Sequence, residues 1–70
     1  DGTTELSESI GSKGQTYLRI PSDGVGQVTV EVNGAQRTYN AKSEDDAEIG
    51  TGDFIEVTDV IGEVLVVKRI

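Results

Sequence analysis

The residues of this chain that could do chemistry are mainly carboxylates. Five of them lie close together in the sequence: Glu44, Asp45, Asp46, Glu48 and Asp53. A calcium-binding EF-hand loop needs oxygen ligands at alternate positions, a central glycine and a final glutamate. The stretch SEDDAEIGTGDF lacks that spacing. We therefore expect a solvated acidic turn here and no metal site.

The sequence offers few groups for catalysis. It has no cysteine and no histidine, which removes the commonest general base and the commonest zinc ligands. Paired carboxylates can act as acid and base, but 13 acidic residues among 70 bring some together by chance. No nucleophile lies beside a base, and no pocket-forming aromatic residues accompany the carboxylates. We expect no catalytic residue and no enzyme activity.

Two stretches that could indicate a bound cofactor lack a feature that the cofactor site requires. The glycine-rich stretch SDGVGQ precedes a predicted strand, so it lacks the helix N-terminus that would hold a phosphate. A lipoyl or biotinyl carrier domain needs its lysine at the tip of a tight hairpin. The clear hairpin tip here is Asn33-Gly34, which has no lysine. We expect no cofactor.

Alternating apolar residues predict short strands as the elements that position these groups. In QTYLRI, Thr16, Leu18 and Ile20 are expected on one face, and Gln15, Tyr17 and Arg19 on the other. Pro21 ends this strand.

QVTVEV, residues 27–32, alternates more regularly, and Asn33-Gly34 is a strong signal for a type I′ hairpin turn. A two-residue turn sets Val30 opposite Arg37 and Val28 opposite Tyr39. Tyr39 is then expected to cap the core, and Arg37 to close one end of the barrel.

The second half of the chain continues the strand pattern after one interruption. Ser43 followed by Asp46 resembles a helix-capping arrangement, so we expect one turn of helix there, with Ile49 packing against the core. Ile55 and Val57 share one face of the next strand, and Phe54 lies on the other. After a tight connection at Gly62, EVLVVKRI is apolar on both faces, which is typical of a central strand.

Five short strands with frequent turns and no long helix predict an all-β fold. Five strands are too few for two sheets, and closing them on one another removes exposed edges. We therefore predict a small five-stranded barrel of the OB type, partly open, over residues 10–70. Residues 1–9 are polar without a period, and we expect a flexible segment or linker there.

Charge limits the partners of the domain. The chain has 6 basic and 13 acidic residues, a net charge of −7, which repels nucleic acid backbones. Tyr17, Arg37 and Tyr39 could still form the aromatic and basic face by which OB-folds bind single strands. Single-stranded nucleic acid binding is therefore the alternative function, and no nucleic acid partner is the preferred prediction.

The exposed aromatic residues point instead to contact with a protein. Tyr17 and Arg19 are expected on the outer face of one strand, and Phe54 on the outer face of another. Exposed aromatic side chains mark contact sites more often than aliphatic ones do. Tyr17, Arg19 and Phe54 are therefore the predicted docking patch.

The order and spacing of these features resemble one known family. The stretches IGSKGQTYLRIPSDGVGQVTV, GAQRTYNAKSED and IGTGDFIEVTDVIGEVLVV together are similar to the soluble C-terminal domain of the NfeD family, across about residues 10–68. The carrying positions are Gly11, Gly14, Leu18, Pro21, Ile49, Gly52, Ile55, Val57, Val60, Gly62, Leu65 and Val67. The acidic run SEDDAE departs from the family pattern.

The resemblance implies an OB-fold interaction domain without an established small-molecule ligand. Members of the family are tethered to membrane-spanning helices, often beside stomatin- or flotillin-like membrane scaffold proteins, and some carry a protease domain upstream. For this chain it implies a stomatin- or flotillin-type partner, upstream membrane anchors outside the chain, and a position on the cytoplasmic side. The chain has no Met, so we expect it to be a piece of a longer or processed protein.

Overall fold

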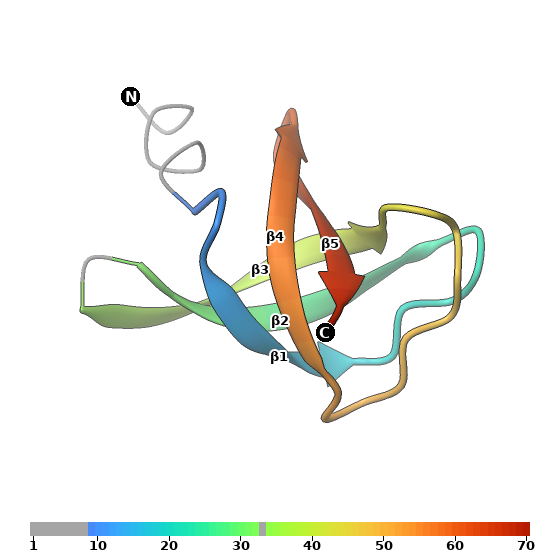
Figure 1. Ribbon diagram of the computed structural model, residues 1–70, viewed down its shortest axis with the longest axis horizontal. Helices are drawn as coiled ribbons and strands as arrows, with labels where there is room; N and C mark the ends of the chain where they lie inside the picture. Colours follow the sequence, from blue (N-terminus) through green and yellow to red (C-terminus); the bar gives the residue numbers. More distant parts are fainter. Residues whose placement is uncertain (1–8, 33) are drawn as a thin grey trace.

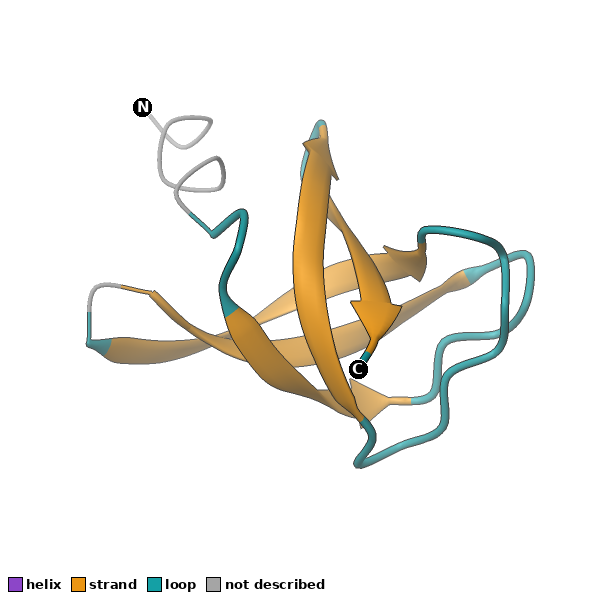
Figure 2. Cartoon of the chain, viewed as in Figure 1, coloured by secondary structure: helices purple, strands orange, loops and turns teal. Residues whose placement is uncertain are grey.

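A computed structural model describes residues 9–32 and 34–70 and shows five strands. They are β1 (Lys13–Leu18), β2 (Val25–Val32), β3 (Ala35–Ser43), β4 (Phe54–Ile61) and β5 (Val64–Arg69) (Figures 1 and 2). The described residues contain no helix, so none of them forms a helix that could cross a membrane. The predicted all-β fold is confirmed. The predicted helical turn after Ser43 is wrong, because residues 44–46 form a turn and a bend.

The strands close into one barrel in the order β1-β2-β3-β5-β4. All neighbouring pairs are antiparallel except β3 and β5, which pair in parallel over Ala41–Ser43. The barrel was expected to be partly open, but β1 also pairs with β4 and closes it. The predicted central strand is confirmed, since β5 lies between β3 and β4 with Leu65, Val66 and Val67 buried. This order brings β1, β4 and β5 side by side.

The β2–β3 hairpin has the predicted register. Val30 pairs with Arg37 and Val28 pairs with Tyr39, while Gly34 has a positive φ of 80°, as a tight turn requires. The expected turn residue Asn33 lies outside the described residues. In Figure 1 the end of β2 and the start of β3 project beyond the rest of the barrel. For that reason Arg37 is exposed, whereas Tyr39 packs against the core as predicted.

The interior of the barrel is filled by aliphatic side chains. Ile20 and Ile49, which lie outside the five strands, form an isolated antiparallel bridge with hydrogen bonds of 2.9 Å in both directions. Ile49 is buried in the core, so its predicted packing is confirmed. The buried cluster consists of Ile20, Val28, Val30, Ala41, Ile49, Ile55, Val57, Leu65 and Val67.

Two bulges reset the alternation of side chains. In β1 the register shifts between Thr16 and Leu18, so Tyr17 is the extra residue. Leu18 then pairs with Gln27 and is 51% exposed, which corrects the prediction that it faces inward. In β4 a shift between Val57 and Asp59 makes Thr58 the extra residue and turns Val60 toward the core. Bulges of this kind bend a strand and re-aim its side chains.

Close packing of the strands depends on a glycine in β1. A Cβ atom on Gly14 would lie 2.2 Å from the carbonyl oxygen of Thr29 and 2.6 Å from Cγ1 of Val30. These distances are far shorter than van der Waals contact, so only glycine lets β1 approach β2 here.

The expected flexible segment over 1–9 falls almost entirely outside the described residues, and its last member, Ser9, is fully buried.

Candidate functional site

Phe54 is the centre of an exposed row on the outer face of the barrel. It is the first residue of β4 and is 63% exposed. Gln15 of β1 pairs with it on one side, and on the other side Ile70 donates a backbone hydrogen bond of 3.1 Å to its carbonyl. Ile70 is also more than half exposed. The three side chains therefore come from three neighbouring parts of the barrel wall.

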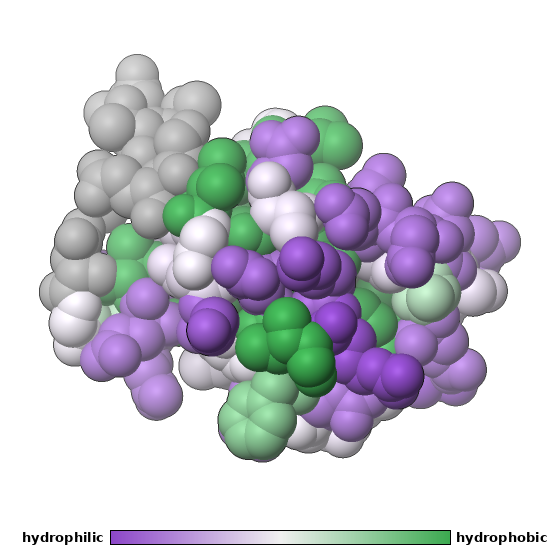
Figure 3. Space-filling view, viewed as in Figure 1, coloured by the Kyte–Doolittle hydropathy of each residue, from purple (hydrophilic) through white to green (hydrophobic). Residues whose placement is uncertain are grey.

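Two further apolar side chains extend this row at the end of β1. Tyr17 and Leu18 are both more than half exposed, because the bulge places Tyr17 outside the β1–β2 ladder. Tyr17 lies two residues beyond Gln15, which makes it a diagonal neighbour of Phe54 across the β1–β4 pair. Figure 3 shows apolar side chains bordered by polar ones where β4 begins and β5 ends. We call Tyr17, Leu18, Phe54 and Ile70 the Phe54 surface.

A groove of about 320 Å³ adjoins Phe54 and crosses β1 toward β3. Its polar lining can both donate and accept hydrogen bonds, through two carboxamides, a hydroxyl, an ammonium and a carboxylate. The lining residues are Lys13, Gly14, Gln15, Thr29, Glu31, Gln36 and Phe54. Gln15 is fixed at the groove by a 3.0 Å hydrogen bond from Nε2 to the carbonyl of Gly52.

One charged row lies beside the Phe54 row. Lys13 of β1 and Lys68 of β5 both pair with Glu56 of β4 across the barrel wall. Glu56 forms a 3.9 Å ion pair with Lys68, and Lys13 forms no ion pair with a described residue. At the end of β5, Arg69 lies 3.9 Å from the carboxylate of Asp53. The Glu56 carboxylate therefore lies between the strands that carry the ammonium groups of Lys13 and Lys68, two residues from Phe54.

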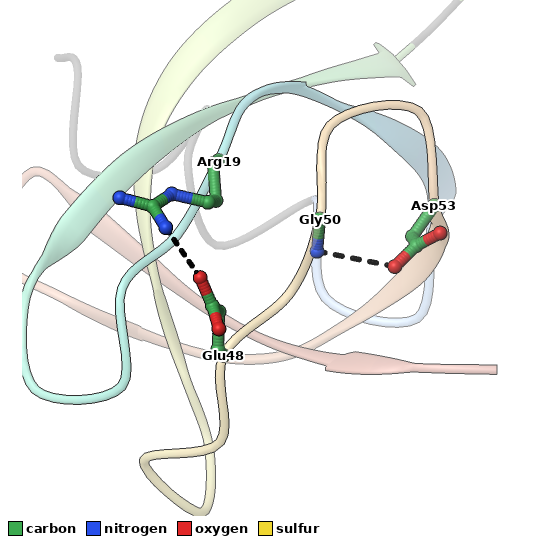
Figure 4. A network of polar contacts seen from close by, with 4 residues as sticks. All are labelled: Arg19, Glu48, Gly50 and Asp53. Atoms are coloured by element: carbon green, nitrogen blue, oxygen red, sulfur yellow. Dashed lines mark hydrogen bonds and ion pairs between the residues drawn. The ribbon is translucent and has the colours of Figure 1, made fainter.

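The third predicted patch residue, Arg19, is held apart from the other two. Its guanidinium donates a 2.6 Å hydrogen bond to Glu48 in the acidic loop, and Figure 4 shows the two side chains pointing toward each other. In the same view Asp53 turns to Gly50, whose amide donates to Oδ2 at 3.1 Å. The structure therefore brings Tyr17 and Phe54 together and directs Arg19 to the loop at residues 44–48.

The acidic loop is organised by Ser43 and by its own backbone. The Ser43 hydroxyl donates to Asp45 Oδ1 at 2.9 Å and accepts from the amide of Ala47 at 3.1 Å. The Ala47 amide also donates to Asp45 Oδ1 at 3.3 Å. The bonds that Asp45 accepts, first from Ser43 and then from Ala47, hold the pKa of Asp45 below its ordinary value. Among residues 9–32 and 34–70, no three acidic side chains are grouped so that they could hold a metal ion. The loop is a solvated turn built on Ser43.

Sequence reasoning did not find Ile70, Lys13 and Gln15 as members of the site. Their contact with Phe54 depends on the strand order, which places β4 between β1 and β5. Periodicity reports which face of a strand a residue occupies, but it does not report which strand lies beside it.

The whole fold matches one family model. The model of the NfeD C-terminal domain covers residues 13–68. The chain belongs to this family. The family assigned from the sequence is therefore confirmed, and the match includes every strand of the barrel except the last residue of β5. No curated protein matches the chain.

Solved structures share this NfeD fold. The soluble domain of the NfeD protein YuaF from Bacillus subtilis is 27% identical, with a TM-score of 0.83 over 97% of this chain and 83% of that one. The C-terminal domain of stomatin operon partner protein 1510-C from Pyrococcus horikoshii is 25% identical, with a TM-score of 0.70 over 90% and 89%.

A third structure is similar in fold alone. It is the soluble domain of a membrane protein implicated in regulation of membrane protease activity from Corynebacterium glutamicum, 19% identical, with a TM-score of 0.65 over 89% of this chain and 94% of that one.

Proposed function

We propose that this domain is a non-catalytic interaction module of a membrane-anchored NfeD-like protein. In this proposal it docks onto a stomatin- or flotillin-type membrane scaffold protein on the cytoplasmic side. Three lines support it: membership of the NfeD C-terminal family, similarity to a domain of a stomatin operon partner protein, and the exposed Phe54 surface.

The Phe54 surface is the observation that carries the docking role. Large apolar side chains that gather on the outside of a small domain mark interaction sites, and aromatic residues at the centre of such a surface often dominate binding energy. Phe54 lies between Gln15 and Ile70, and all three residues are exposed, so a partner that covers Phe54 would also contact the parts of the wall on either side. Tyr17 supplies a second aromatic ring beside it.

Co-purification of the anchored full-length protein with its scaffold partner tests the docking role. We expect that deletion of residues 13–68, or the single change Phe54→Ser, lowers recovery of the scaffold at least tenfold. Ile61→Ser is the matched control, because Ile61 lies at the other end of β4 and is 56% exposed against 63% for Phe54. Equal recovery with and without residues 13–68 would reject docking by this domain. Loss with the deletion but not with Phe54→Ser would move the contact elsewhere on it.

A further inference from the structure

Asp53 lies where the three parts of the Phe54 surface meet. It directly precedes Phe54 in the chain. Its carbonyl oxygen accepts two hydrogen bonds from Thr16, one from the amide at 2.9 Å and one from the hydroxyl at 3.2 Å. Thr16 in turn directly precedes Tyr17. The backbone of Asp53 therefore holds the part of β1 that carries Tyr17 against the start of β4.

The side chain of Asp53 closes the turn that leads into β4. Its Oδ2 accepts the amide of Gly50 at 3.1 Å (Figure 4), and its own amide donates to the Gly50 carbonyl at 3.2 Å. Gly52, the third residue of this turn, has a φ of 89°, and its amide donates to the Thr16 carbonyl at 2.8 Å. Because the two ends of the turn are bonded to each other, the carboxylate fixes the direction in which the chain enters β4 at Phe54.

The same carboxylate reaches the end of β5. Oδ2 of Asp53 lies 3.9 Å from the guanidinium of Arg69, and the next residue, Ile70, donates its amide to the Phe54 carbonyl at 3.1 Å. Both charged side chains are substantially exposed, so this ion pair is weak. The bond from the Gly50 amide to the carboxylate is the stronger of the two side-chain contacts.

We propose that Asp53 is a positioning residue for docking. Its carboxylate holds β1, the start of β4 and the end of β5 in the arrangement that lets Tyr17, Phe54 and Ile70 act as one surface. The proposal rests on the docking role described above and adds the residue that organises the site. A surface that is already ordered loses less entropy when a partner binds. Loss of the carboxylate should therefore weaken docking without unfolding the barrel, whose buried cluster is formed by other residues.

Asp45→Ala is the matched control for Asp53→Ala. Asp45 also accepts a backbone amide through its carboxylate, that of Ala47 at 3.3 Å. The two changes alter the net charge equally, but Asp45 lies in the acidic loop. Asp53→Asn is the rescue variant, because its side-chain oxygen can still accept the Gly50 amide.

Amide hydrogen exchange followed by NMR measures whether the carboxylate holds this junction. Three amides bridge the segments that meet at Asp53, and we call them the junction amides: Thr16, Gly52 and Ile70. We expect Asp53→Ala to speed their exchange by about tenfold, the effect of losing a hydrogen bond to a charged acceptor. The amide of Gly11, which donates to the Val57 carbonyl at 2.8 Å farther along β4, should keep its rate.

The control and rescue variants complete the exchange experiment. Asp45→Ala should leave the junction amides unchanged, and Asp53→Asn should restore most of their protection. Unchanged junction amides in Asp53→Ala would overturn the proposal. Acceleration of the Gly11 amide by the same factor would also overturn it, because it would show a general loss of stability.

Co-purification with the scaffold separates this proposal from the docking role itself. Where Phe54→Ser lowers recovery, Asp53→Ala should lower it by about threefold to tenfold, the cost of ordering one side chain at an interface. Asp53→Asn and Asp45→Ala should stay close to the unmodified protein. Normal recovery with Asp53→Ala beside a loss with Phe54→Ser would overturn the positioning role. Normal recovery with both would reject docking by this surface, whereas the exchange rates test the junction without any partner.

Discussion

Gly14 is a residue where one added methyl group would disturb the packing of two strands. Its missing Cβ would collide with the carbonyl oxygen of Thr29, a backbone atom that cannot rotate away. Gly50 offers a contrast, because a Cβ there would approach only the Asp53 side chain, at 3.4 Å, and its φ is not positive. A comparison of Gly14 with Gly50 therefore separates two effects on stability: the steric need for a residue without a Cβ atom, and the backbone freedom that any glycine has.

Gly14→Ala should destabilise the domain by about 2 kcal/mol or more, since β1 must move away from β2 to make room. Gly50→Ala should change stability by less than about 1 kcal/mol in either direction. Urea unfolding followed by circular dichroism measures both. Equal stability of the two variants would show that β1 and β2 tolerate a wider separation than the structure has.

The Ser43 hydroxyl is the main cause of the lowered pKa of Asp45 in the acidic loop. Since the folded-state pKa of Asp45 lies below its ordinary value of 3.8, the loop bonds stabilise the fold above pH 3.8 and this stabilisation is lost as pH falls further. Ser43→Ala removes the largest cause, so the pKa of Asp45 should rise toward 3.8. Carboxyl carbon shifts across a pH titration measure it, with Asp45→Asn identifying the resonance. An unchanged midpoint would assign the shift to the Ala47 amide alone.

At the scale of elements, the Ile20–Ile49 bridge holds the long loops against the barrel. Ile49 comes from the segment between β3 and β4 and is 2% exposed. Ile49→Ala should therefore cost about 3 kcal/mol in unfolding free energy. Ile61→Ala, on the exposed end of β4, should change it by less than about 0.5 kcal/mol. Thermal unfolding of both variants tests this, and a small cost at Ile49 would mean that the loops are not part of the cooperative unit.

The strands also show how far the sequence predicts the fold. Alternation and the Asn33-Gly34 signal predicted the strands and the pairing of Val28 with Tyr39, because both depend on residues near in sequence. Leu18 was misplaced, since the bulge at Tyr17 arises where β1 must bend to pair with both β2 and β4. Phe54 and Tyr17 were predicted as exposed. The contact of Phe54 with Ile70 depends on strand order, which no local pattern reports.

For the molecule as a whole, the net charge favours a protein partner over a nucleic acid. The net charge of −7 opposes a phosphate backbone, and Tyr39, one of the candidate stacking residues, packs against the core. We expect no binding of labelled single-stranded oligonucleotides in anisotropy titrations at low salt, where electrostatic attraction would be strongest. Saturable binding there would favour the alternative function over protein docking.

The position of β5 has a consequence for how the domain is made. It is the last strand in the sequence, yet it lies between β3 and β4 and supplies Leu65 and Val67 to the interior. During synthesis β3 and β4 each have an unpaired edge until Val64 and the residues after it leave the ribosome. A stalled or clipped product ending before Val64 would expose those edges to neighbouring chains. Such fragments should be the most prone to aggregate and the first to need chaperones.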